Sequence, residues 1–248
     1  MVLAAFPAPA LGWGRQGHRI VADIAQNDLT PVARSQVMAL LKSEKFTRLA
    51  QIANWADEAK ALGLAGSPSH SIRFPLEGGP LLPDACPSGF CAVAAMEMYS
   101  KILADPRAPI ARRVEALKYV VHLAGDIHQP LHCVTATGSR LRLSFQGKET
   151  TLHKMWDRGI LNAQGKSKRA IEAELMARKG DLLGRTPLDW ALESRAIARD
   201  TIYKAVPVKS EAIVVLPDDY ARNNWQVVAM RMAQAGHRLG DLLNHSLK

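Results

Sequence analysis

One stretch organises the predicted fold: Tyr119-Val120-Val121-His122-Leu123-Ala124-Gly125-Asp126-Ile127-His128-Gln129-Pro130-Leu131-His132. Its apolar residues recur at helical spacing and extend a helix that we expect over residues 109–127. Pro130 has no backbone N–H, and its ring would clash with the carbonyl of Asp126, so the helix should kink or end there. We therefore expect His122 and Asp126 on one helix face and His132 beyond the break.

The histidines and aspartates of this region have the spacing of metal ligands. His122 and Asp126 are four residues apart, so they share a helix face and can hold one ion, and His153 and Asp157 repeat the pattern. One such pair is more often a surface hydrogen bond, but two pairs flanking a proline-broken turn favour a metal centre. With His132, the second pair makes three N/O ligands and leaves an open position, which is typical of catalytic zinc. Ligand type alone leaves Mn, Fe and Co open.

Helical patterns also dominate on both sides of this stretch. The predicted class is all-α, a single mainly helical domain with a small surface β-hairpin whose first strand is 141–145. Thr30-Pro31 and Thr186-Pro187 each read as an N-cap followed by a proline at the first helical position. The other predicted segments are helices over 46–62, 90–103 and 217–243, and a loop over 68–87.

Composition places the chain among ordinary soluble proteins and leaves its partner open. The 248 residues suffice for one large domain, and no apolar run is long enough to span a membrane. Lysine and arginine number 32 against 23 acidic residues, a net charge of +9. This balance favours a polyanion such as nucleic acid, or an anionic membrane, as partner. A well-solvated basic surface explains the charge equally well, because the basic residues form no long run.

The N-terminus and the cysteines indicate an oxidising compartment. Residues 1–12 read as a signal-peptide remnant or a disordered tail, with small residues placed for cleavage before Trp13. Cys86 and Cys91 flank a turn-rich loop that could close a small disulfide. Cys133 is expected to be a free buried thiol, with zinc ligation as the alternative.

Several blocks, in order, resemble the S1/P1-type nucleases. Gly125-Asp126-x-His128-Gln129-Pro130-Leu131-His132 looks like that family's most specific motif, and Leu152-His153-x-x-Trp156-Asp157 looks like its companion. The resemblance runs from Trp13 to Asn244. Its other blocks are Trp13-Gly14-Arg15-Gln16-Gly17-His18, Asn54-Trp55-Ala56-Asp57-Glu58, Ser69-His70, Trp190-Ala191-x-Glu193-Ser194 and Ala235-Gly236-x-Arg238-Leu239.

The resemblance implies a mainly helical fold and three zinc ions in one cleft of residues 13–248. It places Asp57, His70, His122 and Asp126 on the first zinc and His132, His153 and Asp157 on the second. The third would be bound by His18, by Asp126 as a bridge, and by the α-amino nitrogen and carbonyl oxygen of Trp13. An amide nitrogen is a poor ligand, so this third site requires cleavage before Trp13. His128 is not a ligand in the pattern and should make a structural hydrogen bond.

The implied activity is a secreted or periplasmic, monomeric endonuclease that cuts single-stranded DNA and RNA to 5′-phosphorylated products, with 3′-nucleotidase activity as an addition. Asp57 and Asp126 would be its catalytic carboxylates. A zinc-dependent phospholipase C is the nearest alternative, disfavoured by the short Trp13–His18 spacing and by Asp157 where those lipases use Glu. A non-catalytic nucleic-acid-binding protein is disfavoured because structural zinc sites are usually closed and rich in thiolates.

The loop after His70 departs from the family pattern. Relatives place an aromatic residue next and an acid or amide two positions later, where this chain has Ser71 and Arg73. We expect Arg73 to contact phosphate, and therefore weak base preference and salt-sensitive binding. The alternative is that Arg73 points to solvent and Phe74 stacks on a base.

Overall fold

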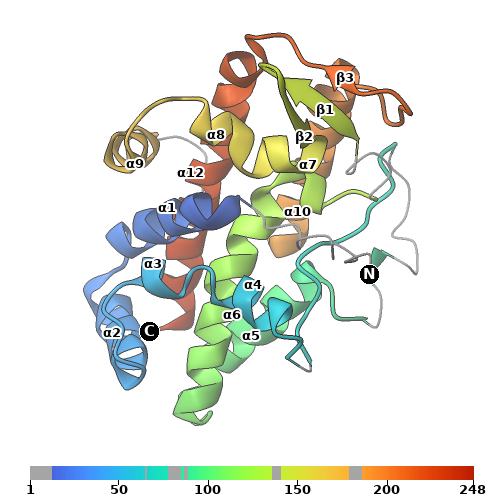
Figure 1. The fold of residues 1–248 in the computed structure, drawn as a ribbon. Helices are drawn as coiled ribbons and strands as arrows, with labels where there is room; N and C mark the ends of the chain where they lie inside the picture. The colour runs from blue at the N-terminus through green and yellow to red at the C-terminus, as the bar shows by residue number, and fades with distance from the viewer. Residues whose placement is uncertain (1–12, 65, 78–84, 87–88, 136–140, 179–185) are drawn as a thin grey trace, which may run out of the picture.

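The computed structural model describes residues 13–64, 66–77, 85–86, 89–135, 141–178 and 186–248. The segment predicted to be a signal remnant or a tail, residues 1–12, lies outside the described residues. Helices make up most of the described part, and a small sheet lies at one end (Figure 1). The predicted mainly helical class is thus confirmed.

Helix α6 (Ile110–His128) runs through the middle of the molecule, packed between α5 (Ala92–Ala104) and α12 (Tyr220–Ser246). Helix α1 (Gly14–Asn27) lies along α12. The other described helices are α2 (Pro31–Ser43), α3 (Leu49–Ile52), α4 (Trp55–Ala61), α7 (Leu152–Lys154), α8 (Ile160–Asn162), α9 (Lys168–Met176), α10 (Pro187–Ile197) and α11 (Tyr203–Ala205).

The C-terminal half of α6 is buried on every side. All residues from Ala116 to His128 are buried, so the polar side chains there depend on protein partners rather than water. The helix ends just before Pro130, as the sequence predicted. Gln129 adopts an extended conformation, and Pro130–His132 forms a 3₁₀ turn. This turn brings His132 back toward the face of α6 that carries Asp126.

The helix predicted over residues 46–62 is wrong in one respect, because the structure divides it. Helix α3 ends at Ile52, and α4 begins at Trp55. The break leaves the carbonyl of Ala53 free of a helical partner, and it accepts a hydrogen bond from Nδ1 of His122 at 2.7 Å. Apolar periodicity continues across the break, so the pattern alone did not reveal it.

The predicted hairpin is present, but it belongs to a larger sheet. Strands β1 (Arg142–Phe145) and β2 (Lys148–Thr151) are antiparallel, with Arg142 opposite Thr151. Gln146 and Gly147, with φ of 50° and 73°, form the turn between them. The expectation of a hairpin alone was incomplete, because β3 (Val214–Val215) pairs with β1 in parallel. A two-residue strand paired across about seventy residues carries no local signal.

Among the described residues, no helix has the length and apolar character that crossing a membrane requires.

Candidate metal centre

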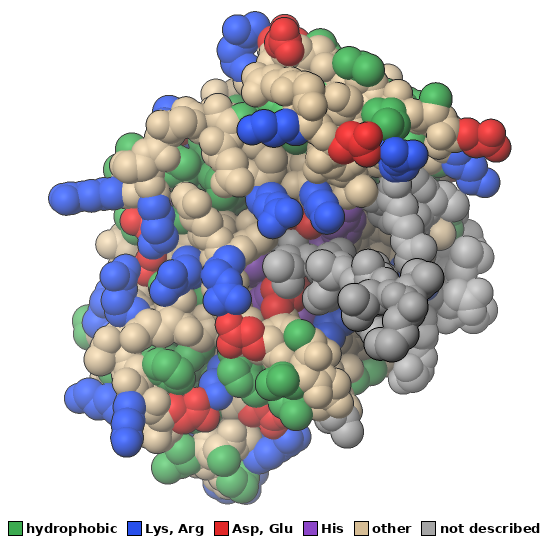
Figure 2. Space-filling view, viewed as in Figure 1, with side chains coloured by type: hydrophobic (Ala, Val, Ile, Leu, Met, Phe, Trp, Pro, Cys, Tyr) green, Lys and Arg blue, Asp and Glu red, His purple; other side chains and the backbone are tan. Residues whose placement is uncertain are grey.

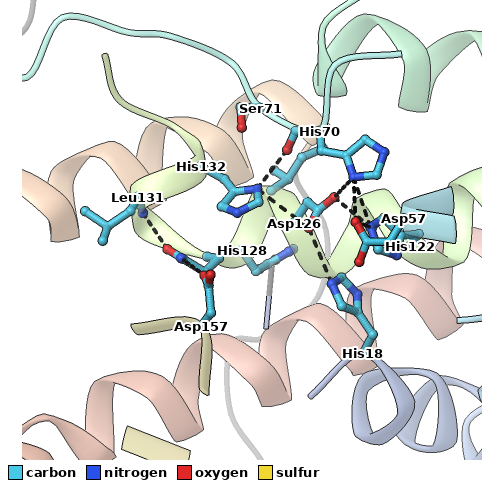
Figure 3. A network of polar contacts seen from close by, with 12 residues as sticks. His18, Asp57, His70, Ser71, His122, Asp126, His128, Leu131, His132 and Asp157 are labelled. Atoms are coloured by element: carbon cyan, nitrogen blue, oxygen red, sulfur yellow. Dashed lines mark hydrogen bonds and ion pairs between the residues drawn. The ribbon is translucent and has the colours of Figure 1, made fainter. Parts of the chain in front are cut away.

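The structure brings the eight predicted side-chain ligands together at the C-terminal end of α6. They form three buried groups whose ligand atoms lie within 4.8 Å of one another: His18, His122 and Asp126; Asp57, His70 and His122; His132, His153 and Asp157. Figure 3 shows side chains from α1, α4, the loop at His70, α6 and the 3₁₀ turn pointing toward Asp126.

Ligand atoms of the first predicted site lie close together, with His70 and His122 each near the carboxylates of Asp57 and Asp126. Nε2 of His122 lies 3.2 Å from Nδ1 of His70, 3.1 Å from Oδ2 of Asp126 and 3.5 Å from Oδ1 of Asp57. Nδ1 of His70 lies 3.2 Å from Oδ1 of Asp57 and 3.3 Å from Oδ2 of Asp126. Two ligands of a tetrahedral zinc, at bonds of about 2.0–2.1 Å, are separated by about 3.3 Å. The spacing of this group therefore fits a zinc ion.

Backbone carbonyls set which nitrogen of two imidazoles faces the group. Nδ1 of His122 donates to the carbonyl of Ala53 at 2.7 Å, and Nδ1 of His132 donates to the carbonyl of His70 at 2.8 Å. Each ring therefore presents its Nε2 lone pair to the centre, as metal-bound histidines held by an outer carbonyl do.

The group of His132, His153 and Asp157 lies beyond the helix break. Nε2 of His132 lies 3.0 Å from Nε2 of His153, which is 3.5 Å from Oδ1 of Asp157. Residues 155–159 form a π-helical turn directly after α7, and this turn carries Asp157. The side-chain amide of Gln129 donates to Asp157. His153 is the least buried ligand, with 12% of its side chain exposed, so the centre is most open here.

The group of His18, His122 and Asp126 joins the start of α1 to α6. Nε2 of His18 lies 3.4 Å from Oδ1 of Asp126, and its ring stacks on that of His122 with centroids 4.0 Å apart. Gly125 makes this approach feasible, since a Cβ there would lie 2.6 Å from Nδ1 of His18. That Cβ would also lie 3.6 Å from the indole of Trp13, so Trp13 is placed beside His18.

Burial and charge leave most of these groups in the form that binds metal. Burial lowers the pKa of His18, His70 and His153, the last to about 3, so these rings are neutral at neutral pH. Burial also disfavours a charge on His122, but Asp126 and Asp57 outweigh it and raise the pKa of His122 to about 10. A cation bound at His122 would take the place of that proton.

The centre also contains buried polar atoms that a bound cation would satisfy. Both carboxylate oxygens of Asp126, Oδ1 of Asp57 and both ring nitrogens of His18 are buried without a hydrogen-bond partner. A carboxylate with no donor is costly inside a protein, and a bound ion removes that cost. Imidazole and carboxylate ligands suit zinc, and the residues present fit the three-ion set implied by the sequence.

A family model described as S1/P1 Nuclease matches residues 13–248. The chain belongs to the S1/P1 nuclease family. It is 34% identical to nuclease P1 of Penicillium citrinum over 154 residues, which are 58% of this chain and 57% of that protein. It is 36% identical to nuclease S1 of Aspergillus oryzae (strain ATCC 42149 / RIB 40) over 155 residues, 59% of this chain and 53% of that protein. The aligned part thus spans little more than half of these fungal relatives.

A plant relative extends the similarity over nearly the whole chain. Endonuclease 2 of Arabidopsis thaliana is 28% identical over 279 residues, which cover 96% of this chain and 92% of that protein.

The two cysteine predictions are confirmed. Cys86 and Cys91 form a disulfide that closes the short loop between them. Cys133 is a buried free thiol whose pKa burial raises to about 12, and its sulfur contacts the carbonyl of Ile127 at 3.2 Å. A neutral thiol facing a carbonyl is no zinc ligand, so the alternative role for Cys133 is not supported.

The two predicted substrate-binding residues lie in different surroundings. Arg73 is exposed, as phosphate contact requires. Phe74 is 1% exposed, forms a bridge with Val134, and lies beneath the guanidinium of Arg195 at 5.2 Å. Its ring offers no open face, so the alternative in which Phe74 stacks on a base is not supported. Residue order could not distinguish the buried neighbour from the exposed one.

Sequence reasoning missed the residues that support the centre from behind. His128 makes the predicted structural hydrogen bond, from Nδ1 to the carbonyl of Ala124. Its Nε2 accepts from Arg238, and Arg231 donates to its carbonyl. Both arginines are 1% exposed and share the carboxylate of Glu193. Arginine is rarely buried, so residue type alone predicted that Arg231 and Arg238 would lie at the surface.

Proposed function

We propose that this chain is an exported zinc-dependent phosphodiesterase that hydrolyses single-stranded DNA and RNA to products with 5′-phosphates, and that also acts as a 3′-nucleotidase. One observation carries the proposal: buried ligand atoms of His70 and His122 lie 3.1–3.5 Å from carboxylate oxygens of Asp57 and Asp126, within a chain of the S1/P1 nuclease family.

The assignment of ligands follows the family resemblance, and the three groups contain all eight of its side-chain ligands. Asp57, His70, His122 and Asp126 would hold one zinc, and His132, His153 and Asp157 a second. His18, Asp126 and the amine and carbonyl of Trp13 would hold a third. A terminal amine at Trp13 requires removal of residues 1–12, which fits export, as does the disulfide. We infer that residues 13–248 form one nuclease domain that acts as a monomer.

The chemistry divides between ions and side chains. Bound zinc lowers the pKa of water and stabilises negative charge on phosphate oxygens. Asp57 presents one oxygen to the imidazoles, and its other oxygen can accept a hydrogen bond from the attacking water and orient it. The carboxylate of Asp126 would offset the positive charge at the two proposed zinc sites that share it. Water oxygen joins phosphorus as the bond to the 3′ oxygen breaks, which leaves the phosphate on the 5′ product.

Arg73 would contact phosphate at this centre, because it is exposed three residues after His70. Substituting Arg73→Ala should weaken binding about equally for all homopolymers and reduce the salt dependence. A loss confined to one base, measured by fluorescence anisotropy, would contradict this role.

A three-substrate assay tests the proposed function. Protein beginning at Trp13, verified by mass spectrometry, is given single-stranded DNA, RNA and phosphatidylcholine with zinc. We expect cleavage of both nucleic acids, 5′-phosphate ends, and complete loss of activity with a strong chelator. Cleavage of phosphatidylcholine alone would indicate a phospholipase, and binding of nucleic acid without cleavage would indicate a non-catalytic protein.

A further inference from the structure

Cationic side chains lie on more than one side of the metal centre. Figure 2 shows histidine side chains at the surface with Lys and Arg on more than one side of them. Four exposed cations follow candidate ligands by one to three residues along the chain, and we call them the basic rim: Lys60 after Asp57, Arg73 after His70, Lys154 after His153, and Arg158 after Asp157.

The rim charges are available to a ligand. Within the described part of the chain, no acidic side chain lies within ion-pair distance of any of the four, whereas Arg15 nearby is paired with Glu58 at 3.2 Å. A Cβ added at Gly14 would lie 3.4 Å from that of Arg158, so Arg158 lies between the start of α1 and the second ligand group. This group is also the most exposed part of the centre.

No comparable platform for nucleobases accompanies the rim. Every Phe, Tyr and Trp among the described residues is buried or half-buried. Phe74, the nearest candidate in the His70 loop, is covered by Arg195. Base stacking on an aromatic ring contributes about 1–3 kcal/mol per base. Since no described aromatic ring is fully exposed, phosphate contacts should supply most of the affinity.

We propose that Lys60, Lys154 and Arg158, together with Arg73, form a track for the phosphates of a single-stranded polyanion, so that affinity rises with strand length and is indifferent to base. The inference rests on the proposed nuclease function and specifies how its substrate is bound. Nucleic acid is favoured over an anionic membrane because the four cations each follow a ligand of one buried centre, where even the least buried ligand, His153, is only 12% exposed.

A binding experiment tests the track without cleavage. Labelled oligo(dT) and oligo(dA) of about 20 nucleotides are titrated in a chelator by fluorescence anisotropy, with circular dichroism to verify folding. The variant is Lys154→Gln/Arg158→Gln. The matched control is Lys42→Gln/Lys101→Gln, which removes the same charge from exposed positions on α2 and α5 with no ion-pair partner among the described residues.

The expected result is a change in salt dependence. Each phosphate contact with a single strand contributes about 0.7 to the steepness of the fall of log affinity with log salt concentration. The rim variant lacks two such contacts, so its slope should be shallower than that of the parent by about 1.4. Between 50 and 200 mM salt the parent should therefore lose about sevenfold more affinity than the rim variant. Both oligonucleotides should respond equally. A rim variant that matches the control pair, or a loss seen with one base only, overturns the proposal.

A second measurement separates this proposal from the proposed function. With zinc present, the loss in kcat/KM of the rim variant should grow from a dinucleotide to a strand of about 20 nucleotides. An equal loss at every length contradicts a track. Parent protein that cleaves nothing would reject the nuclease function, while the binding experiment would still decide the track. Vesicles of phosphatidylglycerol serve as competitor, and a rim variant that loses vesicle binding but keeps oligonucleotide binding assigns the rim to membranes and overturns the proposal.

Discussion

Asp126 is the residue on which the centre depends most. Its Oδ2 lies 3.1 Å from His122 and 3.3 Å from His70, while its Oδ1 lies 3.4 Å from His18. One carboxylate thus faces two ligand groups from a fully buried position on α6. The i,i+4 pair with His122 was predictable from spacing. The contacts with His18 and His70 were expected only from family resemblance, because they join segments far apart in the chain.

The double role of Asp126 leads to an unequal pair of variants. Asp126→Asn should reduce bound zinc by two ions and lower kcat/KM by more than about a hundredfold, because the two proposed zinc sites that share Asp126 lose their common negative ligand. His18→Ala should remove one ion and cost less. Metal analysis and kinetics on folded protein test this, and equal damage from both substitutions would argue against a bridge.

Gly125 is a residue whose role follows from what a side chain there would meet. A Cβ would lie 2.6 Å from Nδ1 and 2.8 Å from Cε1 of His18, whose ring cannot retreat because it stacks on His122. Gly125→Ala should therefore displace His18, remove the third zinc and destabilise the fold by about 1–3 kcal/mol.

Gly240→Ala provides the control, since a Cβ there would lie 3.0 Å from that of Asp28, between α12 and α1. It should lower thermal stability without changing the zinc content. Three zinc ions retained in Gly125→Ala would refute the positioning role of Gly125.

Helix α6 ends inside the molecule, and its last carbonyls need partners. Ser194 of α10 donates to the carbonyl of Ile127 at 2.6 Å, and Arg231 of α12 donates to that of His128 at 3.2 Å. Oε2 of Glu193 accepts hydrogen bonds from Arg231 at 2.8 Å and from Arg238 at 2.6 Å. Two other helices therefore fix the turn of α6 that carries Asp126.

Removing the charge of Glu193 should loosen this junction. Glu193→Gln removes the carboxylate of Glu193 from two buried guanidinium groups, which should cost about 2–4 kcal/mol after allowance for partial exposure, or roughly 5–15 °C in Tm. Burial favours a raised pKa for Glu193, but Arg238 and Arg231 outweigh it and lower the pKa. The stabilisation is therefore present above the unfolded pKa and is lost as pH falls through the lower folded pKa.

Thermal unfolding of parent and variant across this acidic range measures the effect, with Glu149→Gln as the control. The exposed pair of Glu149 and Arg142 should contribute less than about 1 kcal/mol. If Glu193→Gln proved as mild as that control, the junction would not hold α6.

The elements differ in how far the sequence specified them. Proline and threonine caps located the starts of α2 and α10, where Thr30 and Thr186 accept the predicted hydrogen bonds. Pro130 located the end of α6. The break between α3 and α4, the π-helical turn at Asp157 and strand β3 were not predicted, because each depends on partners distant in sequence rather than on local pattern. The buried Arg231 and Arg238 escaped prediction for the same reason.

For the whole molecule, the order of the motifs predicted more about the metal centre than the composition did. A net charge of +9 left nucleic acid, membrane and plain solvation open. The blocks from Trp13 to Asn244 predicted that residues from five segments would converge, and the structure places the eight side-chain ligands in three adjoining groups. Substrate binding was less predictable, since the exposure of Arg73 and the burial of Phe74 depend on how the loop packs.

We propose that the mature chain holds three zinc ions, one of them through the terminal amine of Trp13. The most direct test is zinc per chain, measured by mass spectrometry on two preparations with verified N-termini. Protein beginning at Trp13 should hold close to three zinc ions and be active. Protein beginning at Met1 should hold close to two and be nearly inactive, because an amide nitrogen is a poor ligand. Active protein with one zinc or none, or full activity and three zinc ions in the chain beginning at Met1, would contradict the account.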